Sequence, residues 1–191
     1  MPDEDARNNH RYHPFYCEEN IYYLCSDLIG SHHRLQALFI SNARRACLFH
    51  NQKATPPGRP TVWDYHVVLL DGPSNDVPRY RIRDFDTRLS FGIDAEEYLQ
   101  KTFDRPGSDR FRPRFRLVSA REFLATFSTD RRHMRKDPEN QASPWLQPPP
   151  PWDPPRGSNA ASEHELPAYI SMEPEGPGVL VDLEELLEMI R

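Results

Sequence analysis

Three side chains in this chain are of the types that a thiol hydrolase uses: Cys17, His66 and Asp84. In such an enzyme a cysteine attacks a carbonyl carbon, an imidazole transfers protons, and a carboxylate holds the imidazole in one tautomer. His66 lies in the run Trp63-Asp64-Tyr65-His66-Val67-Val68, within an apolar stretch at 62–70 that predicts a buried or half-buried strand. A histidine in a strand is held rigidly, which suits a catalytic base.

Cys17 has the local setting of a reactive thiol. Apolar residues recur after it at helical spacing and Gly30 follows as a stop signal, which predicts a helix over about 17–29 with Cys17 in its first turn. A helix N-terminus and a nearby imidazolium both lower the pKa of a thiol. Cys25 falls on the apolar face of the same helix and Cys47 lies beside apolar residues, so both are expected to act as small hydrophobic side chains.

Asp84 is the expected partner of His66. Residues 80–86 are a plausible return strand after the turn signal at 71–75. If the two strands pair with position 66 opposite position 84, the two side chains project from the same face with Cβ atoms roughly 5 Å apart. Asp86 has the same parity but would lie one diagonal away, so the geometry favours Asp84.

Each of these residue types also has a common structural role. A cysteine near a helix start is more often structural, and a histidine in a strand is more often a hydrogen-bonded core or edge residue. Composition and spacing therefore leave the catalytic and the structural interpretations open. The remaining histidines and the cysteines lack the spacing of a zinc site, and no glycine-rich phosphate loop is present. The arginines of 105–121 alternate with apolar residues, which indicates a solvated strand face.

The totals point to one domain in a reducing compartment. The chain has 191 residues, 20 prolines and a net charge of -5, and its mean hydropathy is -0.79. The charge gives no reason to expect a nucleic-acid or membrane surface. Three cysteines without repeated spacing fit a cytosolic or nuclear protein better than a disulfide framework, and the acidic first residues are not a secretory signal. We expect a monomer.

The elements that must position these residues indicate an α+β fold with a mainly antiparallel sheet. Residues 1–14 are expected to be disordered, and 15–191 to form a single catalytic domain in which 135–166 is a proline-rich surface segment. The other expected elements are a hairpin of 38–40 and 47–49, a strand at 111–117, a helix capped by Ser119, a strand at 179–181 and a last helix capped by Asp182.

A set of short motifs resembles the protein N-terminal glutamine amidohydrolase family, also named for its WDYHV motif. The motifs occur in family order and cover nearly everything from residue 16 onward. They are Tyr16-Cys17-Glu18-Glu19-Asn20-Ile21, Phe39-Ile40-Ser41-Asn42, Trp63 to Leu70, Asp84-Phe85-Asp86-Thr87, Ser128-Thr129-Asp130-Arg131-Arg132-His133-Met134, the tetraproline at 148–151, and Ile170-Ser171-Met172 with the strand and helix after it.

The resemblance implies a triad on an α/β sandwich of the papain/transglutaminase-like kind, with Cys17 as nucleophile, His66 as base and Asp84 as orienting acid. The implied reaction converts the N-terminal glutamine of a protein to glutamate and releases ammonia, without a metal or organic cofactor. In the family this step feeds the Arg/N-degron pathway. The chain departs from the pattern in Pro73 and Pro78 and in the length of 135–166, all peripheral to the triad.

Specificity for an N-terminal residue requires a recess for the α-ammonium group, because burying that charge unpaired is costly. Glu18, Glu19, Asp64 and Asp86 are candidates that the sequence does not separate. Asparagine should be rejected by depth, because its shorter side chain would leave the carboxamide out of reach of Cys17.

Two other functions fit parts of the sequence. A thiol peptidase or transglutaminase would use the same triad, and an open cleft that accepts residues on both sides of the reacting one would favour it. A non-enzymatic module would offer the proline-rich segment to SH3 or WW-type domains. The Cys17→Ala substitution would leave the function of that module unchanged, whereas it would abolish the activity of either enzyme.

Overall fold

The protein is built around one six-stranded sheet. Its computed structural model describes residues 6–31, 34–74, 77–103 and 109–191. The strands follow the order β6-β5-β4-β1-β7-β8, and every neighbouring pair is antiparallel. They are β1 (Leu35–Ser41), β4 (Tyr65–Asp71), β5 (Arg81–Arg83), β6 (Ile93–Asp94), β7 (Arg114–Ser119) and β8 (Val179–Val181).

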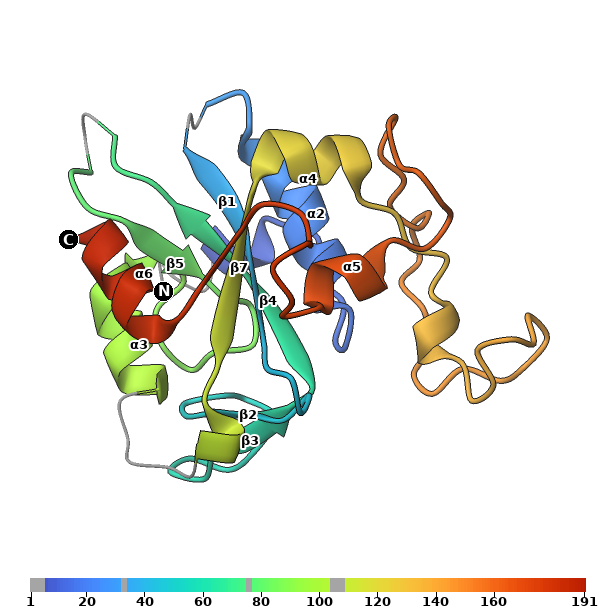
Figure 1. The fold of residues 1–191 in the computed structure, drawn as a ribbon, viewed down its shortest axis with the longest axis horizontal. Helices are drawn as coiled ribbons and strands as arrows, with labels where there is room; N and C mark the ends of the chain where they lie inside the picture. The colour runs from blue at the N-terminus through green and yellow to red at the C-terminus, as the bar shows by residue number, and fades with distance from the viewer. Residues whose placement is uncertain (1–5, 32–33, 75–76, 104–108) are drawn as a thin grey trace.

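Helices cover both faces of this sheet (Figure 1). On one face lie α2 (Cys17–Leu28), α4 (Ala120–Thr126) and α5 (Leu166–Ile170), and on the other lie α3 (Ala95–Phe103) and α6 (Leu183–Ile190). The predicted α+β class with a mainly antiparallel sheet is therefore confirmed. No helix among the residues described above is both long and apolar enough to cross a bilayer.

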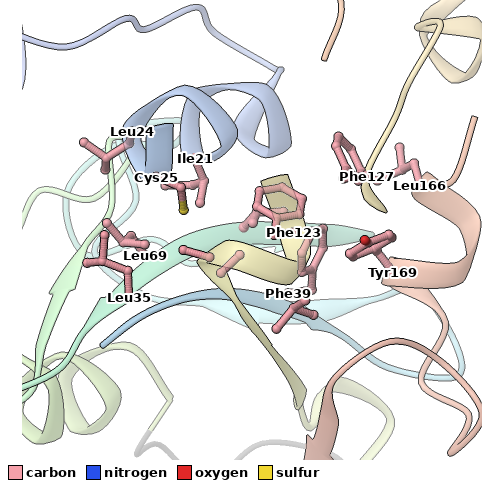
Figure 2. Close-up of a cluster of buried hydrophobic side chains, with 14 of the residues drawn as sticks. Ile21, Leu24, Cys25, Leu35, Phe39, Leu69, Phe123, Phe127, Leu166 and Tyr169 are labelled. Atoms are coloured by element: carbon pink, nitrogen blue, oxygen red, sulfur yellow. The ribbon is translucent and has the colours of Figure 1, made fainter. Parts of the chain in front are cut away.

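Each face has its own hydrophobic core, because β1 and β4 are buried on both sides and send alternate residues to opposite faces. Under α2, α4 and α5 an aromatic group from β1, α4 and α5 packs with the apolar face of α2 (Figure 2). The second core lies under α3 and α6. Val67 and Leu69 belong to the first core, and Val68 and Leu70 to the second.

The ends of two helices follow the capping signals in the sequence. The Ser119 side chain accepts a hydrogen bond from the Glu122 backbone N–H at the start of α4. At the start of α6, Asp182 and Glu185 form a reciprocal capping box. Such caps satisfy backbone donors that the first turn of a helix leaves free.

The predicted hairpin of 38–40 and 47–49 is wrong. The first segment belongs to β1, which pairs with β4 and β7, whereas β2 (Cys47–Phe49) pairs with β3 (Thr61–Trp63) in a separate two-stranded sheet. The Asn42 side chain stabilises the turn between β1 and β2, because its amide N–H groups donate to the carbonyls of Ala46, Arg110 and Arg112. The predicted strand at 62–70 is likewise divided at Asp64 into β3 and β4.

Arg116 contradicts the expectation of a solvated arginine face on β7. Its side chain is fully buried, and its guanidinium donates to the backbone carbonyls of Ser171, Glu173 and Pro177. The chain between α5 and β8 thus covers the face that the alternating pattern assigned to solvent. Carbonyl acceptors compensate part of the cost of burying this charge.

Residues 127–165 form a layer of loops held by backbone pairing. Backbone hydrogen bonds join Thr129 to Pro155, Gly157 to Phe127 and Leu146 to Met134. A Cβ at Gly157 would lie 2.3 Å from the Ala125 carbonyl oxygen, so this close approach requires glycine.

The N-terminal residues from 6 onward contact the domain as well; residues 1–5 of the segment expected to be disordered lie outside the described part. Arg7 donates to the Leu89 carbonyl, and the Asn20 amide is hydrogen-bonded to the backbone of His13. The segment 6–16 therefore packs on the loop that follows β5 and on the start of α2.

Candidate active site

A hydrogen bond between His66 and Asp84 forms the centre of the candidate site. His66 Nε2 lies 2.9 Å from Asp84 Oδ1, and both side chains are buried, with exposed fractions of 3% and 0%. His66 stands on β4, next to the backbone of Val67, and Asp84 comes directly after β5. Because Nε2 faces the carboxylate, Nδ1 is the ring nitrogen that this contact leaves for chemistry.

Asp84 is fixed by further donors as well. Its Oδ2 accepts hydrogen bonds from the Gln52 amide at 3.1 Å and from the Tyr98 hydroxyl at 2.9 Å. Its Oδ1 also accepts the Asp86 backbone N–H at 2.9 Å. Burial alone would raise the pKa of Asp84, but the charge of His66 and these hydrogen bonds outweigh it and lower the pKa to about 2.

The predicted route to this contact is wrong, because positions 66 and 84 are not a cross-strand pair. The register of β4 and β5 places Leu69 opposite Arg83, so β5 ends before Asp84. Continued along both strands, the same register would set position 66 opposite position 86. Asp84 reaches His66 instead from the irregular backbone that follows β5.

Two aromatic rings limit the motion of the His66 ring. The Trp63 ring is stacked on it with centroids 5.9 Å apart, and the Phe49 ring meets it edge-on at 5.6 Å. Burial would lower the pKa of His66, but the Asp84 charge and hydrogen bond more than offset this and raise the pKa above its ordinary value of 6.5. The hydrogen bond to Asp84 therefore both orients the His66 ring and stabilises its imidazolium form.

Cys17 is the first residue of α2 and lies partly buried against the first core. Its thiol is within reach of the β4 backbone at Val67, the residue after His66, and its Sγ lies 3.7 Å from Glu18 Oε2. The predicted lowering of its pKa is wrong. Burial, together with the carboxylates of Glu18 and Asp86, raises the pKa of this thiol well above 9.0, although the Val67 backbone hydrogen bond opposes them.

The other two cysteines are buried and structural, as expected. Cys25 packs in the first core and Cys47 in the second. Burial raises the pKa of both thiols to about 12. Neither is therefore a candidate nucleophile.

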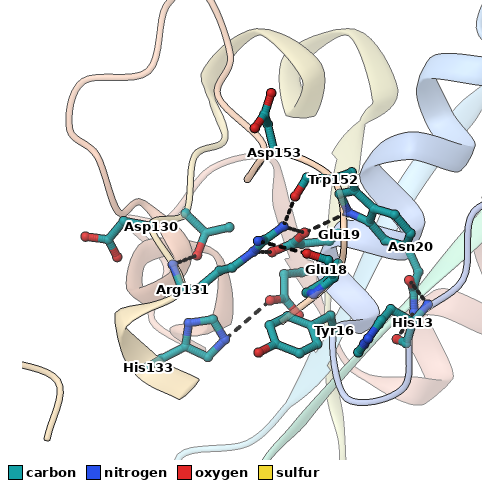
Figure 3. Close-up of polar contacts among 12 residues, drawn as sticks. His13, Tyr16, Glu18, Glu19, Asn20, Asp130, Arg131, His133, Trp152 and Asp153 are labelled. Carbon is teal, nitrogen blue, oxygen red and sulfur yellow. Dashed lines mark hydrogen bonds and ion pairs between the residues drawn. The ribbon is translucent and has the colours of Figure 1, made fainter. Parts of the chain in front are cut away.

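Glu18, the residue after Cys17, belongs to a buried polar cluster in which its carboxylate faces His133 (Figure 3). The Tyr65 hydroxyl donates to its Oε2 at 3.1 Å, and His133 Nε2 lies 3.3 Å from its Oε1. The carboxylate is fully buried. Burial would raise the pKa of Glu18, but His133 and Tyr65 outweigh it and lower the pKa.

Glu19 joins the loop layer to α2 through a buried ion pair (Figure 3). Arg131 Nε and Nη2 lie 2.7 and 2.8 Å from the two carboxylate oxygens, and the Trp152 indole N–H donates to Oε2 at 3.0 Å. Glu19 is fully buried and the Arg131 side chain is 8% exposed. The Glu19 carboxylate, two positions after Cys17, is therefore used to hold the loop layer against α2.

We expect Arg131→Met to destabilise the protein by about 3–5 kcal/mol, because it leaves the Glu19 carboxylate buried without its cation. Arg132→Met is the matched control, since Arg132 pairs with Asp130 on a surface where its side chain is 41% exposed. That control should cost less than about 1 kcal/mol. Urea denaturation followed by fluorescence checks both, and equal effects of the two variants would contradict the assignment.

His66, Asp84 and Asp86 also have one ligand-type atom each within 4.8 Å of the others. Such spacing can hold a metal ion in principle. Here both Asp84 oxygens already accept hydrogen bonds from protein donors, including the Tyr98 hydroxyl. The donor set therefore fits a hydrogen-bonded acid better than a metal ligand.

A model of the N-terminal glutamine amidase family matches residues 12–190. The chain belongs to this family. It is 36% identical to the protein N-terminal glutamine amidohydrolase of Bos taurus over 98% of this chain and 90% of that protein. It is also 36% identical to the Homo sapiens protein of that name over 97% and 90%, and to that of Drosophila ananassae over 90% and 84%.

Two residues of the candidate site, Gln52 and Tyr98, were not predicted from the sequence; both donate hydrogen bonds to Asp84. Gln52 lies in a loop without a local pattern, and an isolated bridge to Thr87 together with backbone hydrogen bonds between the two loops brings it here. Tyr98 had a usable signal. It lies on the apolar face of α3, and a buried tyrosine hydroxyl needs a hydrogen-bond partner.

Proposed function

We propose that this protein deamidates the N-terminal glutamine of proteins and peptides to glutamate, with Cys17 as nucleophile, His66 as base and Asp84 as orienting acid. The observation that carries the proposal is the family match over residues 12–190, which includes all three residues. The buried His66–Asp84 hydrogen bond and the position of Cys17 at the start of α2 support it. The product would enter the Arg/N-degron pathway.

The first step requires a base because burial and the carboxylates of Glu18 and Asp86 raise the pKa of the Cys17 thiol. His66 Nδ1 removes the thiol proton as Sγ attacks the Cδ carbon of the glutamine side chain. The resulting imidazolium is stabilised by Asp84, which stays ionised. The raised thiol pKa thus makes His66 a true general base in this mechanism.

Ammonia leaves in the second step. The imidazolium returns its proton to the carboxamide nitrogen, the Cδ–N bond breaks, and a γ-thioester to Cys17 remains. His66 then takes a proton from water, whose oxygen attacks the thioester carbon. The Cδ–S bond breaks, the proton goes back to sulfur, and the product carries a glutamate side chain.

The start of α2 offers a donor for the negative oxygen of each tetrahedral intermediate. The first backbone N–H groups of a helix have no partner within it, and Cys17 is the first residue of α2. Its N–H is therefore placed beside the reacting carbon when Sγ bonds to that carbon. The helix dipole adds to this stabilisation.

The pH dependence of kcat/KM should show this base. We expect activity to rise with pH as His66 loses its proton, with a midpoint above 6.5, because the Asp84 charge outweighs burial and raises the pKa of His66. The rate of thiol alkylation should in turn rise only toward the high pKa of Cys17. A midpoint at or below 6.5, or rapid alkylation in acid, would contradict the assignment.

Ammonia release tests the proposed reaction against its rivals. The wild-type protein should release ammonia from a peptide that begins with glutamine, and not from the same peptide with an acetylated N-terminus. Cleavage of a peptide bond would identify a peptidase instead. Incorporation of an added amine would identify a transglutaminase. Either of these outcomes would replace the proposal.

A further inference from the structure

Four carboxylates lie near the triad, and the structure separates them by what each already binds. Glu18 Oε2 accepts the Tyr65 hydroxyl, and its Oε1 lies 3.3 Å from His133 Nε2 without a protein hydrogen bond. Glu19 is paired with Arg131 and accepts the Trp152 indole N–H. Both carboxylates are fully buried, and a substrate cation at either would have to displace the His133 or Arg131 side chain that already lies beside it. Asp64 and Asp86 are therefore the better candidates for binding the substrate ammonium group.

Asp86 is tied to the catalytic pair by its backbone and by a side chain from the N-terminal segment. Its N–H donates to Asp84 Oδ1 at 2.9 Å. Its Oδ1 accepts the Tyr12 hydroxyl at 2.6 Å, and the Tyr12 ring is stacked on Phe85 with centroids 5.5 Å apart. These contacts hold a half-buried carboxylate within 4.8 Å of the ligand atoms of His66 and Asp84.

The second oxygen of this carboxylate is the one that can receive a substrate. Within the four described ranges, no protein hydrogen bond ends on Asp86 Oδ2, and the donor on Oδ1 is a neutral hydroxyl. Burial raises the pKa of Asp86 and the Asp84 charge adds to this, whereas the charges of His66 and Lys53 and the hydrogen bond from Tyr12 lower it. A cation bound at Asp86 would offset the repulsion between the Asp84 and Asp86 carboxylates.

We propose that Asp86 binds the α-ammonium group of the N-terminal glutamine through Oδ2, and that Tyr12 positions its carboxylate through Oδ1. This inference rests on the proposed deamidation. Asp64 is less suited, because its side chain is exposed and a surface ion pair with a solvated ammonium contributes little. Asp86 lies in the half-buried position where pairing of opposite charges is stronger.

Binding of the ammonium group at Asp86 would also make the reaction selective for the length of the substrate side chain. The ammonium nitrogen and the carboxamide carbon of glutamine are separated by four bonds, roughly 5 Å when extended, and those of asparagine by three bonds, roughly 3.8 Å. Once the ammonium is fixed, the asparagine carboxamide stops short of Cys17. An internal glutamine has an uncharged amide nitrogen in place of the ammonium and gains nothing from the carboxylate.

The test compares two peptides that differ only in the α-amino group: one begins with glutamine, and the other with a desamino glutamine residue. Affinities are measured on the Cys17→Ala background so that turnover does not interfere. Asp86→Asn should weaken binding of the glutamine peptide by about 10- to 100-fold and leave the desamino peptide within about twofold. Tyr12→Phe should give a smaller loss on the glutamine peptide alone.

Asp64→Asn is the matched control and should change neither affinity. An equal loss on both peptides in Asp86→Asn would mean that Asp86 acts through the fold or through His66, and would overturn the proposal. So would the absence of any loss, or a selective loss in Asp64→Asn. Failure of the proposed function is distinct from these outcomes, because it would show as no deamidation by the wild-type protein.

Discussion

Cys17→Ala is expected to reduce ammonia release from a glutamine-initiated peptide on the order of 10⁴-fold or more, because the reaction then has no nucleophile and the triad acts as a unit. The fold should be retained. Cys17 is the first residue of α2, its side chain is only partly buried, and alanine favours helix. Ammonia release and thermal unfolding of the same sample measure the two effects separately.

Cys25→Ala is the matched control for this prediction. Cys25 is fully buried in the first core, about two turns along α2 from Cys17. Its loss should cost roughly 1–2 kcal/mol of stability by leaving a small cavity, with activity per folded molecule unchanged. If the Cys25 variant lost the activity and the Cys17 variant kept it, the assignment of the nucleophile would be wrong.

Asp84→Asn is expected to lower kcat/KM on the order of 10³- to 10⁴-fold, because an asparagine amide can present a donor to His66 and favour the wrong tautomer. The midpoint of the pH profile should also move to lower pH. The Asp84 charge is what raises the pKa of His66 against the effect of burial, so its removal lets burial lower that pKa. The measurement is kcat/KM as a function of pH.

Tyr98→Phe provides the comparison for Asp84→Asn. It removes one neutral donor to Asp84 Oδ2 and leaves the His66 contact in place. Its effect on kcat/KM should therefore be far smaller, about tenfold or less. If Tyr98→Phe were as damaging as Asp84→Asn, the tyrosine hydroxyl would have a role of its own in the reaction.

Local patterns in the sequence predicted the elements that position the site. The helix from Cys17, the strand that holds His66 and the capped helix at Asp182 are present because periodicity and capping residues depend on neighbours in the chain. Local patterns did not predict which strands pair with each other. The hairpin of 38–40 with 47–49 looked favourable locally, but β1 pairs with β4 and β7 because both of its faces are buried.

The contact between His66 and Asp84 was expected, although the register argument for it was wrong. Because β5 ends at Arg83, the side chain of Asp84 need not follow the alternation of side chains between the two faces of a strand. The residue at which a strand ends cannot be read from that alternation alone. The raised pKa of Cys17 was also beyond local reasoning. It depends first on burial, which the sequence does not show, then on the adjacent Glu18 carboxylate and on the Asp86 carboxylate, which is distant in the sequence.

The carboxylates beside Cys17 show why the ammonium partner could not be chosen from the sequence. Glu18 and Glu19 are the nearest in the chain, yet residues more than 110 positions away bind them, namely His133, Arg131 and Trp152. No local sequence pattern shows that a carboxylate already has a partner elsewhere in the protein. The structure leaves Asp86 as the better candidate because its neighbours, Tyr12 and Asp84, leave one oxygen open.

Mass spectrometry in heavy-oxygen water tests the central claim most directly. The wild-type protein is incubated with two peptides of the same composition, one with glutamine at the N-terminus and one with glutamine inside. We predict that the first becomes a glutamate-initiated peptide with one heavy oxygen in its side chain, while the second is unchanged. An unchanged first peptide, conversion of the internal glutamine, or cleavage of either backbone would contradict N-terminal glutamine deamidation.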